Sequence, residues 1–217
     1  MDFWSPIQIS IKVTLIASMV AFLPAIIAAW WMANRTYKGK MIVETFLMLP
    51  LVLPPTVVGF GLLVLFGNQS WLGKGIEWLF QQPIVFTWWA AVIAASVVAF
   101  PLIYQTLKTG FESVDKELED AARSMGANEW QVFRYVTLPL SWRFTLSGYM
   151  LGFTRGLGEF GATLMFAGDI PGETETIPTA IFMAAESGNM TLASYWVVSI
   201  VVLSFILMSV IHKIRGT

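Results

Sequence analysis

The chain has 217 residues, of which 56% are apolar and only 12% are charged, and its formal net charge is −1. A soluble domain carries about 25% charged residues, so the surplus apolar surface must face something other than water, most simply lipid. A nucleic-acid partner is disfavoured because such proteins carry a clear basic excess, and the absence of cysteine excludes disulfides and thiolate chemistry.

Five apolar segments are long enough to cross a bilayer, which takes about 20 helical residues. Little polar sequence remains to enclose so many helices in a water-soluble fold. We therefore predict an all-α integral membrane protein with one transmembrane domain over residues 1–217. The predicted spans, in chain order, are 9–32, 45–66, 86–107, 144–166 and 192–211.

The charges between these spans predict an orientation. The first span is preceded by the acidic Asp2 and followed by Arg35, Lys38 and Lys40, which is unlike a cleaved signal peptide. Basic residues also gather in loop 108–143 and the C-terminal tail, whereas loops 67–85 and 167–191 are mostly acidic. By the positive-inside rule we expect a retained first span, the N-terminus outside and the C-terminus in the cytoplasm.

The second predicted span contains Pro50, Pro54 and Pro55. Proline removes a backbone donor and clashes with the preceding turn, so this helix should kink or break. Irregular backbone at membrane depth is tolerated only where it is buried in protein or lines a cavity. Two interpretations stay open for this stretch, namely a packing kink or a wall of a translocation path.

The polar loop between the third and fourth spans predicts two short helices around a turn. Asp115 can cap the first helix, and Asn128 can cap the second with Gln131 three residues later, as in a capping box. Gly126 suits the turn between them, where a positive φ is needed. Pro139 marks the place where the second helix gives way to the next span.

This loop also carries a spaced motif. Asp120-Ala121-Ala122 is followed by a spacer of three residues and then Gly126. A spacer of nine residues separates Gly126 from Val136, and a single residue separates Val136 from Leu138-Pro139. The pattern resembles the cytoplasmic motif of ABC importer permeases, in which Glu-Ala-Ala, Gly, Ile and Leu-Pro stand at the same spacing. Here Asp120 replaces the glutamate and Val136 replaces the isoleucine.

The resemblance implies a type I ABC importer transmembrane bundle, in which residues 108–143 form a coupling loop. In that family the loop docks into a groove on a separate ATPase subunit, which binds ATP and Mg²⁺, so no cofactor is expected on this chain. The implied coupling residues are Glu119, Asp120, Ala121, Ala122, Gly126, Val136, Leu138 and Pro139.

The fourth predicted span carries two features. Gly148, Gly152 and Gly156 share one helical face, which predicts close helix packing within the subunit or across a dimer. Arg155 and Glu159 stand four residues apart, and a charge inside the bilayer should face the protein interior. They form either an intrahelical pair or, for Arg155, a contact with a passing anion. With Pro50, Pro54 and Pro55 they are the candidate substrate-pathway residues.

Residues 154–163 and 170–178, together with 49–55 and 57–59, resemble the molybdate permease branch of this family. Sulfate permeases share the Gly-Glu-Phe-Gly-Ala part at 158–162. The resemblance implies import of molybdate or tungstate across the cell inner membrane by a homodimer of this permease, two ATPase subunits and an external oxyanion-binding protein. A short apolar stretch at 177–185 predicts a re-entrant or interfacial segment in the last outer loop.

Three alternatives are weighed against this interpretation. A sulfate or thiosulfate ABC permease shares much of the pattern. A secondary anion transporter working without ATP would show inverted repeats or several intramembrane charges, and it leaves the Asp120-to-Pro139 motif unexplained. An enzyme is disfavoured because the sequence has no phosphate loop or metalloprotease motif, and its single histidine, His212, has no partner for catalysis or metal binding.

Overall fold

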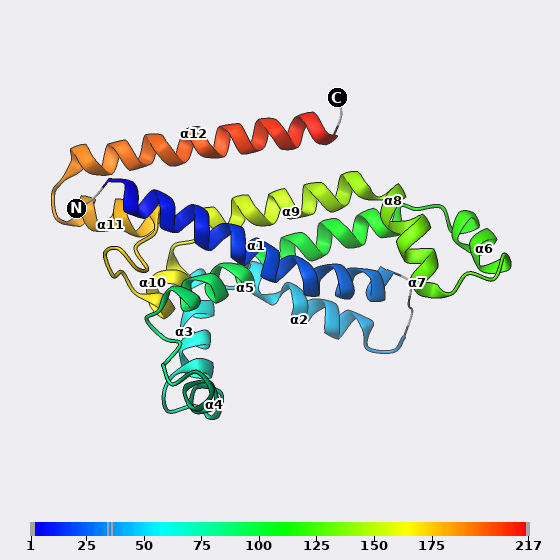
Figure 1. Cartoon of the computed structure of the whole chain (residues 1–217), viewed down its shortest axis with the longest axis horizontal. Helices are drawn as coiled ribbons and strands as arrows, with labels where there is room; N and C mark the ends of the chain where they lie inside the picture. The colour runs from blue at the N-terminus through cyan, green and yellow to red at the C-terminus, as the bar shows by residue number, and fades with distance from the viewer. Residues whose placement is uncertain (1–2, 34, 36, 216–217) are drawn as a thin grey trace.

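The computed structural model describes residues 3–33, 35 and 37–215. In that part of the chain every regular element is helical, which confirms the predicted all-α class (Figure 1). The element η1 is a π-helix. The helices are α1 (Trp4–Ala33), α2 (Lys40–Val52), α3 (Pro55–Phe66), α4 (Trp71–Phe80), α5 (Trp88–Glu112), α6 (Lys116–Ser124), α7 (Glu129–Val132), η1 (Phe133–Thr137), α8 (Leu138–Leu140), α9 (Trp142–Leu157), α10 (Gly161–Ala167), α11 (Ile177–Glu186) and α12 (Met190–Arg215).

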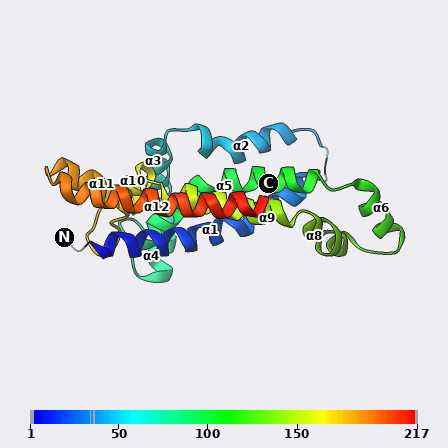
Figure 2. The ribbon, with the colours of Figure 1, turned by 90° about the horizontal axis from the view of Figure 1, so that it is seen from above.

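Helices α1, α5, α9 and α12 run lengthwise through the molecule (Figure 1). The first three pack against one another, and α12 lies along α9 and α11. Figure 2 shows α11 at the same end as the N-terminus and α6 at the opposite end. The chain is therefore an elongated bundle with short helices at both ends.

Small side chains form the contact between α1 and α5. Every fourth residue of α1 from Ala17 to Ala29 is a buried alanine. Small residues let two backbones approach closely, which favours helix association where no water is present to drive it. Their counterparts on α5 are the buried alanines Ala90, Ala91, Ala94, Ala95 and Ala99.

The three glycines of α9 continue this close packing. A Cβ atom at Gly152 would lie 2.3 Å from Cγ1 of Ile103, and one at Gly156 would lie 3.3 Å from Cγ2 of Thr14. Ile103 belongs to α5 and Thr14 to α1, so the glycine face packs within the subunit. Of the two predicted roles, packing within the subunit or packing across a dimer, the structure supports packing within the subunit.

The second predicted span is broken, as its prolines predict. It forms α2 and α3, which are bent by 111° relative to each other. Leu53 takes an extended conformation, which is the conformation that a following proline favours. Pro54 then caps α3 and Pro55 occupies its first turn, where a missing N–H group costs nothing.

The fourth predicted span is also interrupted. It is divided into α9 and α10 by Gly158, Glu159 and Phe160. The prediction that Arg155 and Glu159 lie on one continuous helix is therefore wrong, because Glu159 lies in the break. Gly158 ends α9, since its N–H group bonds back to the carbonyl groups of Thr154 and Gly156.

Three helices in the described part of the chain are long and apolar enough to cross a membrane, and they are α1, α5 and α12. The bent pair α2 and α3 raises this number to four if it forms one span. Helix α9 has 16 residues and is shorter than the usual spanning length. Five spans and their orientation stay predictions.

Polar contacts fix the helices at the N-terminal end. The Ser10 hydroxyl of α1 accepts a hydrogen bond of 2.7 Å from the N–H group of Ile177 at the start of α11. The indole N–H group of the buried Trp196 donates to the carbonyl of Phe3 at 3.1 Å. The short apolar stretch at 177–185 is thus a helix packed on α1 and α12.

Candidate functional site

Residues 112–139, called the projecting segment below, extend beyond the ends of α1, α5 and α9 (Figure 1). Asp115 accepts a hydrogen bond of 2.9 Å from the N–H group of Glu117 at the start of α6. Asn128 and Gln131 exchange two hydrogen bonds of 2.9 and 2.8 Å at the start of α7. Both predicted helix caps are confirmed.

Gly126 makes the turn between α6 and α7. Its φ of +90° lies in the left-handed region, which costs a side-chain-bearing residue about 1–2 kcal/mol. The N–H group of Gly126 bonds to the carbonyl of Arg123 at 3.0 Å, and that of Ala127 bonds to the carbonyl of Ala122 at 3.1 Å. The predicted positive φ is confirmed, and it sets the angle between the two helices.

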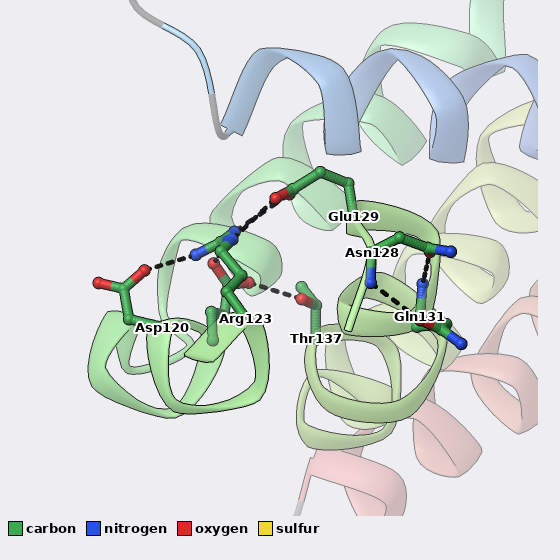
Figure 3. A network of polar contacts seen from close by, with 7 residues as sticks. Asp120, Arg123, Asn128, Glu129, Gln131 and Thr137 are labelled. Atoms are coloured by element: carbon green, nitrogen blue, oxygen red, sulfur yellow. Dashed lines mark hydrogen bonds and ion pairs between the residues drawn. The ribbon is translucent and has the colours of Figure 1, made fainter. Parts of the chain in front are cut away.

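Arg123 joins α6 to α7 through three carboxylates (Figure 3). Its Nη1 atom lies 2.7 Å from Oδ1 of Asp120, and its Nε atom lies 2.8 Å from Oε1 of Glu129. Its Nη2 atom lies 3.2 Å from the second oxygen of Glu129 and 3.4 Å from Glu119. Sequence reasoning missed this residue, although acids three and four residues before an arginine on a helix are a usable signal.

The bidentate contact keeps both partners charged. Hydrogen bonds from Arg123 hold the pKa of the Glu129 carboxyl below its usual range. The same bonds to Glu129 raise the pKa of the Arg123 guanidinium above its ordinary value. Because both groups are partly exposed, solvent screens the pair, and its main consequence is a fixed geometry for the turn.

Glu119 points into the projecting segment. Glu119 is only 4% exposed, and its Oε1 atom accepts a hydrogen bond of 2.6 Å from the hydroxyl of Thr137 in η1. A buried carboxylate requires such partners, because removing an unpaired charge from water is costly. The predicted coupling residue Glu119 therefore connects α6 to η1 inside the segment.

A cluster of aromatic side chains in tilted and edge-to-face contact fixes the base of the projecting segment to the bundle. The ring of Phe133 in η1 lies 4.8 Å from that of Trp30 at the end of α1 and 5.6 Å from that of Phe111 in α5. Trp130 of α7 lies 5.7 Å from Phe133 and 6.2 Å from Trp30. Aromatic pairs at these distances add about 0.5–1.5 kcal/mol each beyond the area that they bury.

Pro139 explains the π-helix. A proline inside an α-helix lacks the N–H group for the carbonyl four residues earlier and clashes with it. The wider turn of η1 avoids this contact, and the N–H group of Leu138 bonds to the carbonyl of Phe133 five residues earlier. The helix continues through Pro139 in α8, and the turn before α9 lies at Ser141, two residues beyond the predicted junction.

The outer side of α6 is exposed and partly apolar. Leu118 is exposed with Ala121 and Met125 on the same side, at the three- and four-residue spacing of one helical face. Asp120 is exposed beside them, and Ala122 is half-buried. Val136 and Leu138 are half-buried, and Leu138 packs against the core cluster that α1 and α5 form with Phe133.

The breaks in the two interrupted spans lie side by side. A Cβ atom at Gly161, the first residue of α10, would lie 3.1 Å from Cβ of Pro55, the first residue of α3. A Cβ atom at Gly59 would lie 2.8 Å from Cα of Ala162. Residues about a hundred positions apart in the sequence thus meet where two helices restart.

Arg155 and Glu159 form an ion pair across the end of α9. The Nη1 atom of Arg155 lies 2.8 Å from Oε2 of Glu159. The other oxygen of Glu159 accepts a hydrogen bond of 2.8 Å from the N–H group of Ala162 in the first turn of α10. Glu159 is 2% exposed, and an arginine and a helix start together compensate its charge.

The structure therefore brings Pro55, Arg155 and Glu159 to one region of the bundle. Pro50 lies apart from them, in an apolar groove between α1, α2 and α5 that Pro24 and Phe100 also line. The projecting segment lies at the far end of the long helices (Figure 2). In the described residues, no group of three or more histidine, aspartate or glutamate side chains could hold a metal ion.

Residues 25–214 match the family described as the binding-protein-dependent transport system inner membrane component. The chain belongs to this family. It is a multi-pass inner-membrane transport subunit, and its family consists of transporter components rather than enzymes.

Curated relatives that resemble this chain over most of its length include permeases named for molybdenum transport. One, from Bacillus subtilis (strain 168), is 52% identical over 212 residues, which cover 98% of this chain and 93% of the relative. ModB of Escherichia coli (strain K12) is 42% identical over 179 residues, which cover 82% of this chain and 78% of the relative. A permease of Mesostigma viride named for sulfate transport is 34% identical over 197 residues, which cover 91% of this chain and 72% of the relative.

Solved structures of ABC importers share the fold. The inward-facing MetNI methionine ABC transporter matches with a TM-score of 0.71 at 16% identity, over 98% of this chain and 92% of the other. A bacterial alginate ABC transporter in complex with its pentasaccharide-bound periplasmic protein matches with a TM-score of 0.75 at 16% identity, over 98% and 79% of the two chains. This confirms the predicted class of transmembrane fold.

Proposed function

We propose that this chain is the permease subunit of an ATP-driven importer of molybdate or tungstate. The observation that carries the proposal is the 52% identity, over nearly the whole of both chains, to a permease named for molybdenum transport. Relatives named for sulfate transport match this chain at 32–34% identity, such as the 34% identical permease of Mesostigma viride. A sulfate importer is accordingly the second candidate.

The working transporter contains two copies of this chain, two ATP-binding subunits and an external oxyanion-binding protein. The family description, which names dependence on a binding protein, supports the last of these. A second copy is supported by the surface of α12, where the described side chains beyond Trp196 are exposed or half-buried. The partner ATPase binds ATP and Mg²⁺ and hydrolyses the ATP, and the permease transmits the resulting motion of the ATPase to the transmembrane bundle.

The projecting segment couples this ATPase to the bundle. Asp120 and Ala121 present a small, exposed surface on α6 beside the half-buried Ala122, and Gly126 sets the direction of that helix. Glu119 supports this surface from inside the segment through Thr137, and Val136, Leu138 and Pro139 lie in η1 and α8, through which the segment continues into α9. The aromatic contacts of Phe133 with α1 and α5 make the segment a rigid extension of the bundle, as a lever must be.

The substrate path runs past the two adjacent helix breaks. Irregular backbone at membrane depth lines a cavity or is buried in protein. The proximity of Pro55 to Gly161, and of Glu159 to the start of α10, supports a path at this point that Pro54, Pro55, Arg155 and Glu159 line. Arg155 is already neutralised by Glu159, so it offers a passing dianion a weak contact rather than a tight site. Weak sites favour rapid release along a path. Pro50 contributes the bend of the adjoining helix.

Import then follows alternating access. The binding protein docks on loops 67–85 and 167–191, ATP binding draws the two ATPases together, and the projecting segments rock the two bundles open toward the outside. Hydrolysis returns the bundle to the inward-facing state. The pathway faces outward only while the ATPases are closed, so an oxyanion cannot leak through when no nucleotide is bound.

The test is uptake by purified permease and ATPase in lipid vesicles with the loaded binding protein. We expect uptake of molybdate and tungstate that requires ATP and stops when a non-hydrolysable ATP analogue replaces it. Preferential uptake of sulfate under the same conditions would favour the second candidate. Uptake by the permease alone, without the ATPase, would contradict the ATP-driven mechanism.

A further inference from the structure

Helix α4 has an aromatic side that the rest of the described chain leaves uncovered. Trp71 is 80% exposed and Trp78 is 84% exposed, and Leu79 and Phe80 are exposed as well. At 100° per residue, Trp71, Gly75, Trp78 and Leu79 share one side of the helix. Lys74 and Glu77, both exposed, form its polar edge.

The opposite side of α4 rests on the protein. Leu72 and Ile76 are half-buried and Gly73 is buried. A Cβ atom at Gly73 would lie 2.2 Å from the carbonyl oxygen of Gly67, so only glycine allows the helix to lie so close to the end of α3. The exposed side of α4 is therefore the one that faces away from the bundle.

Hydrogen bonds fix the orientation of α4 on α3. The Ser70 hydroxyl accepts a bond of 2.8 Å from the N–H group of Gly73 and donates one of 2.6 Å to the carbonyl of Leu65. Gln81 ends the helix in the left-handed conformation, with its N–H group bonded to the carbonyl of Glu77 at 2.8 Å. The aromatic side thus has a defined direction.

The position of α4 is consistent with a membrane surface. It lies crosswise to the long helices in both views, beyond α3 at the side of the bundle, in the half of the molecule opposite the projecting segment (Figures 1 and 2). Exposed aromatic residues also mark the starts of α1 and α5 at that end, namely Trp4 and Trp89. Tryptophan gathers at the level where hydrocarbon meets water.

We propose that α4 is an interfacial helix, with its aromatic side in the headgroup region of the bilayer on the side opposite the projecting segment. A helix with tryptophan and leucine on one side and charges at its edge takes this position. Apolar side chains are exposed on the neighbouring α3 as well, namely Phe60, Val64 and Leu65. That surface belongs to a chain of the inner membrane, so lipid is the occupant that already borders it.

Single-cysteine spin labelling tests this position, because the chain contains no cysteine. Gly75→Cys places the label at the centre of the aromatic side and leaves every tryptophan intact, and a Cβ atom there meets nothing within 4 Å. Glu77→Cys is the matched control, two residues away on the polar edge. The labelled permease, assembled with its ATPase in lipid vesicles, is exposed to oxygen, which partitions into lipid, and to a water-soluble nickel chelate.

We expect the ratio of oxygen to nickel accessibility to be several-fold higher at position 75 than at position 77. A label at position 75 that is more accessible to nickel than to oxygen would show that the face lies in water, which overturns the proposal. A label shielded from both reagents would show that protein covers the face, such as a second copy or the binding protein, and would overturn it equally. If Gly75→Cys does not assemble, Trp78→Cys is measured by the same criteria.

Discussion

At the scale of single residues, two buried glutamates in the described part of the chain form ion pairs with the same spacing in the sequence. Glu119 and Glu159 each pair with an arginine four residues away in the sequence, Arg123 and Arg155 respectively. The spacing of both pairs is visible in the sequence. Their further partners are not, because Thr137 and the N–H group of Ala162 reach the carboxylates only after separate helices have packed.

The Arg155–Glu159 pair leads to a stability prediction. Arg155→Gln leaves the Glu159 carboxylate buried without its cation, and breaking a buried pair costs about 3 kcal/mol or more. Because the Arg155 side chain is 30% exposed, solvent screens the pair, and we expect a loss of stability of about 3 kcal/mol and not more. The measurement is the unfolding midpoint of the purified permease in mixed detergent micelles with increasing SDS.

The double variant Arg155→Gln with Glu159→Gln is the control, since it removes both charges and should recover much of the lost stability. If Arg155→Gln alone unfolds at the midpoint of the unchanged protein, the pair contributes nothing to stability. If the same variant abolishes transport while stability is unchanged, Arg155 contacts the substrate instead of serving the fold.

At the scale of elements, the projecting segment combines what sequence predicts well and what it predicts poorly. Helix caps at Asp115 and Asn128 and the glycine turn at Gly126 are local, so their residues predict them correctly. The π-helix η1 is a local consequence of Pro139 that a helix pattern does not reveal. The aromatic base depends on Trp30, which is a hundred residues away from Trp130 in the sequence.

Gly126 offers a test of the segment as a lever. Gly126→Val forces a β-branched residue to φ of +90°, which costs at least about 1–2 kcal/mol and turns α6 away from its position. We expect loss of ATP-driven uptake and of substrate-stimulated ATPase activity while the bundle stays folded. Both activities are measured in reconstituted vesicles.

Gly126→Asn separates the backbone from other causes, because asparagine adopts the left-handed conformation more readily than valine. It should retain more activity than the valine variant. Full transport by Gly126→Val would show that the direction of α6 is not needed for coupling.

At the scale of the whole molecule, the elongated bundle separates its parts. The projecting segment lies at one end, and α11, α4 and the paired helix breaks lie toward the other (Figures 1 and 2). This arrangement suits a transporter in which a motor acts at one membrane surface and a binding protein at the other. The charge pattern of the loops predicts which surface is cytoplasmic.

The orientation can be tested with one exposed residue of α6. Ser124→Cys introduces the only thiol of the chain, and a membrane-impermeant maleimide should label it in inverted membrane vesicles but not in intact spheroplasts. Asn68→Cys, in the turn between α3 and α4, is the matched control and should show the opposite pattern. Labelling of position 124 from outside would reverse the predicted orientation and remove the coupling proposal.

The amino-acid sequence was sufficient to predict the membrane class, the helical content and the helix caps and glycine turn of the projecting segment. These properties depend on composition, on hydrophobic length and on residues within a few positions of each other. It also predicted the break at Pro54, since proline acts on its own backbone.

Only the tertiary structure decided that the break after Leu157 exists, that it lies against the Pro54 break, and that the glycines of α9 pack within the subunit. These outcomes depend on which helices meet. The sequence of α9 allows its glycines to pack against several different helices, and only the packing of α1, α5 and α9 shows which helices they contact. Close contact between two helices depends on both surfaces, so the sequence of one helix does not specify it.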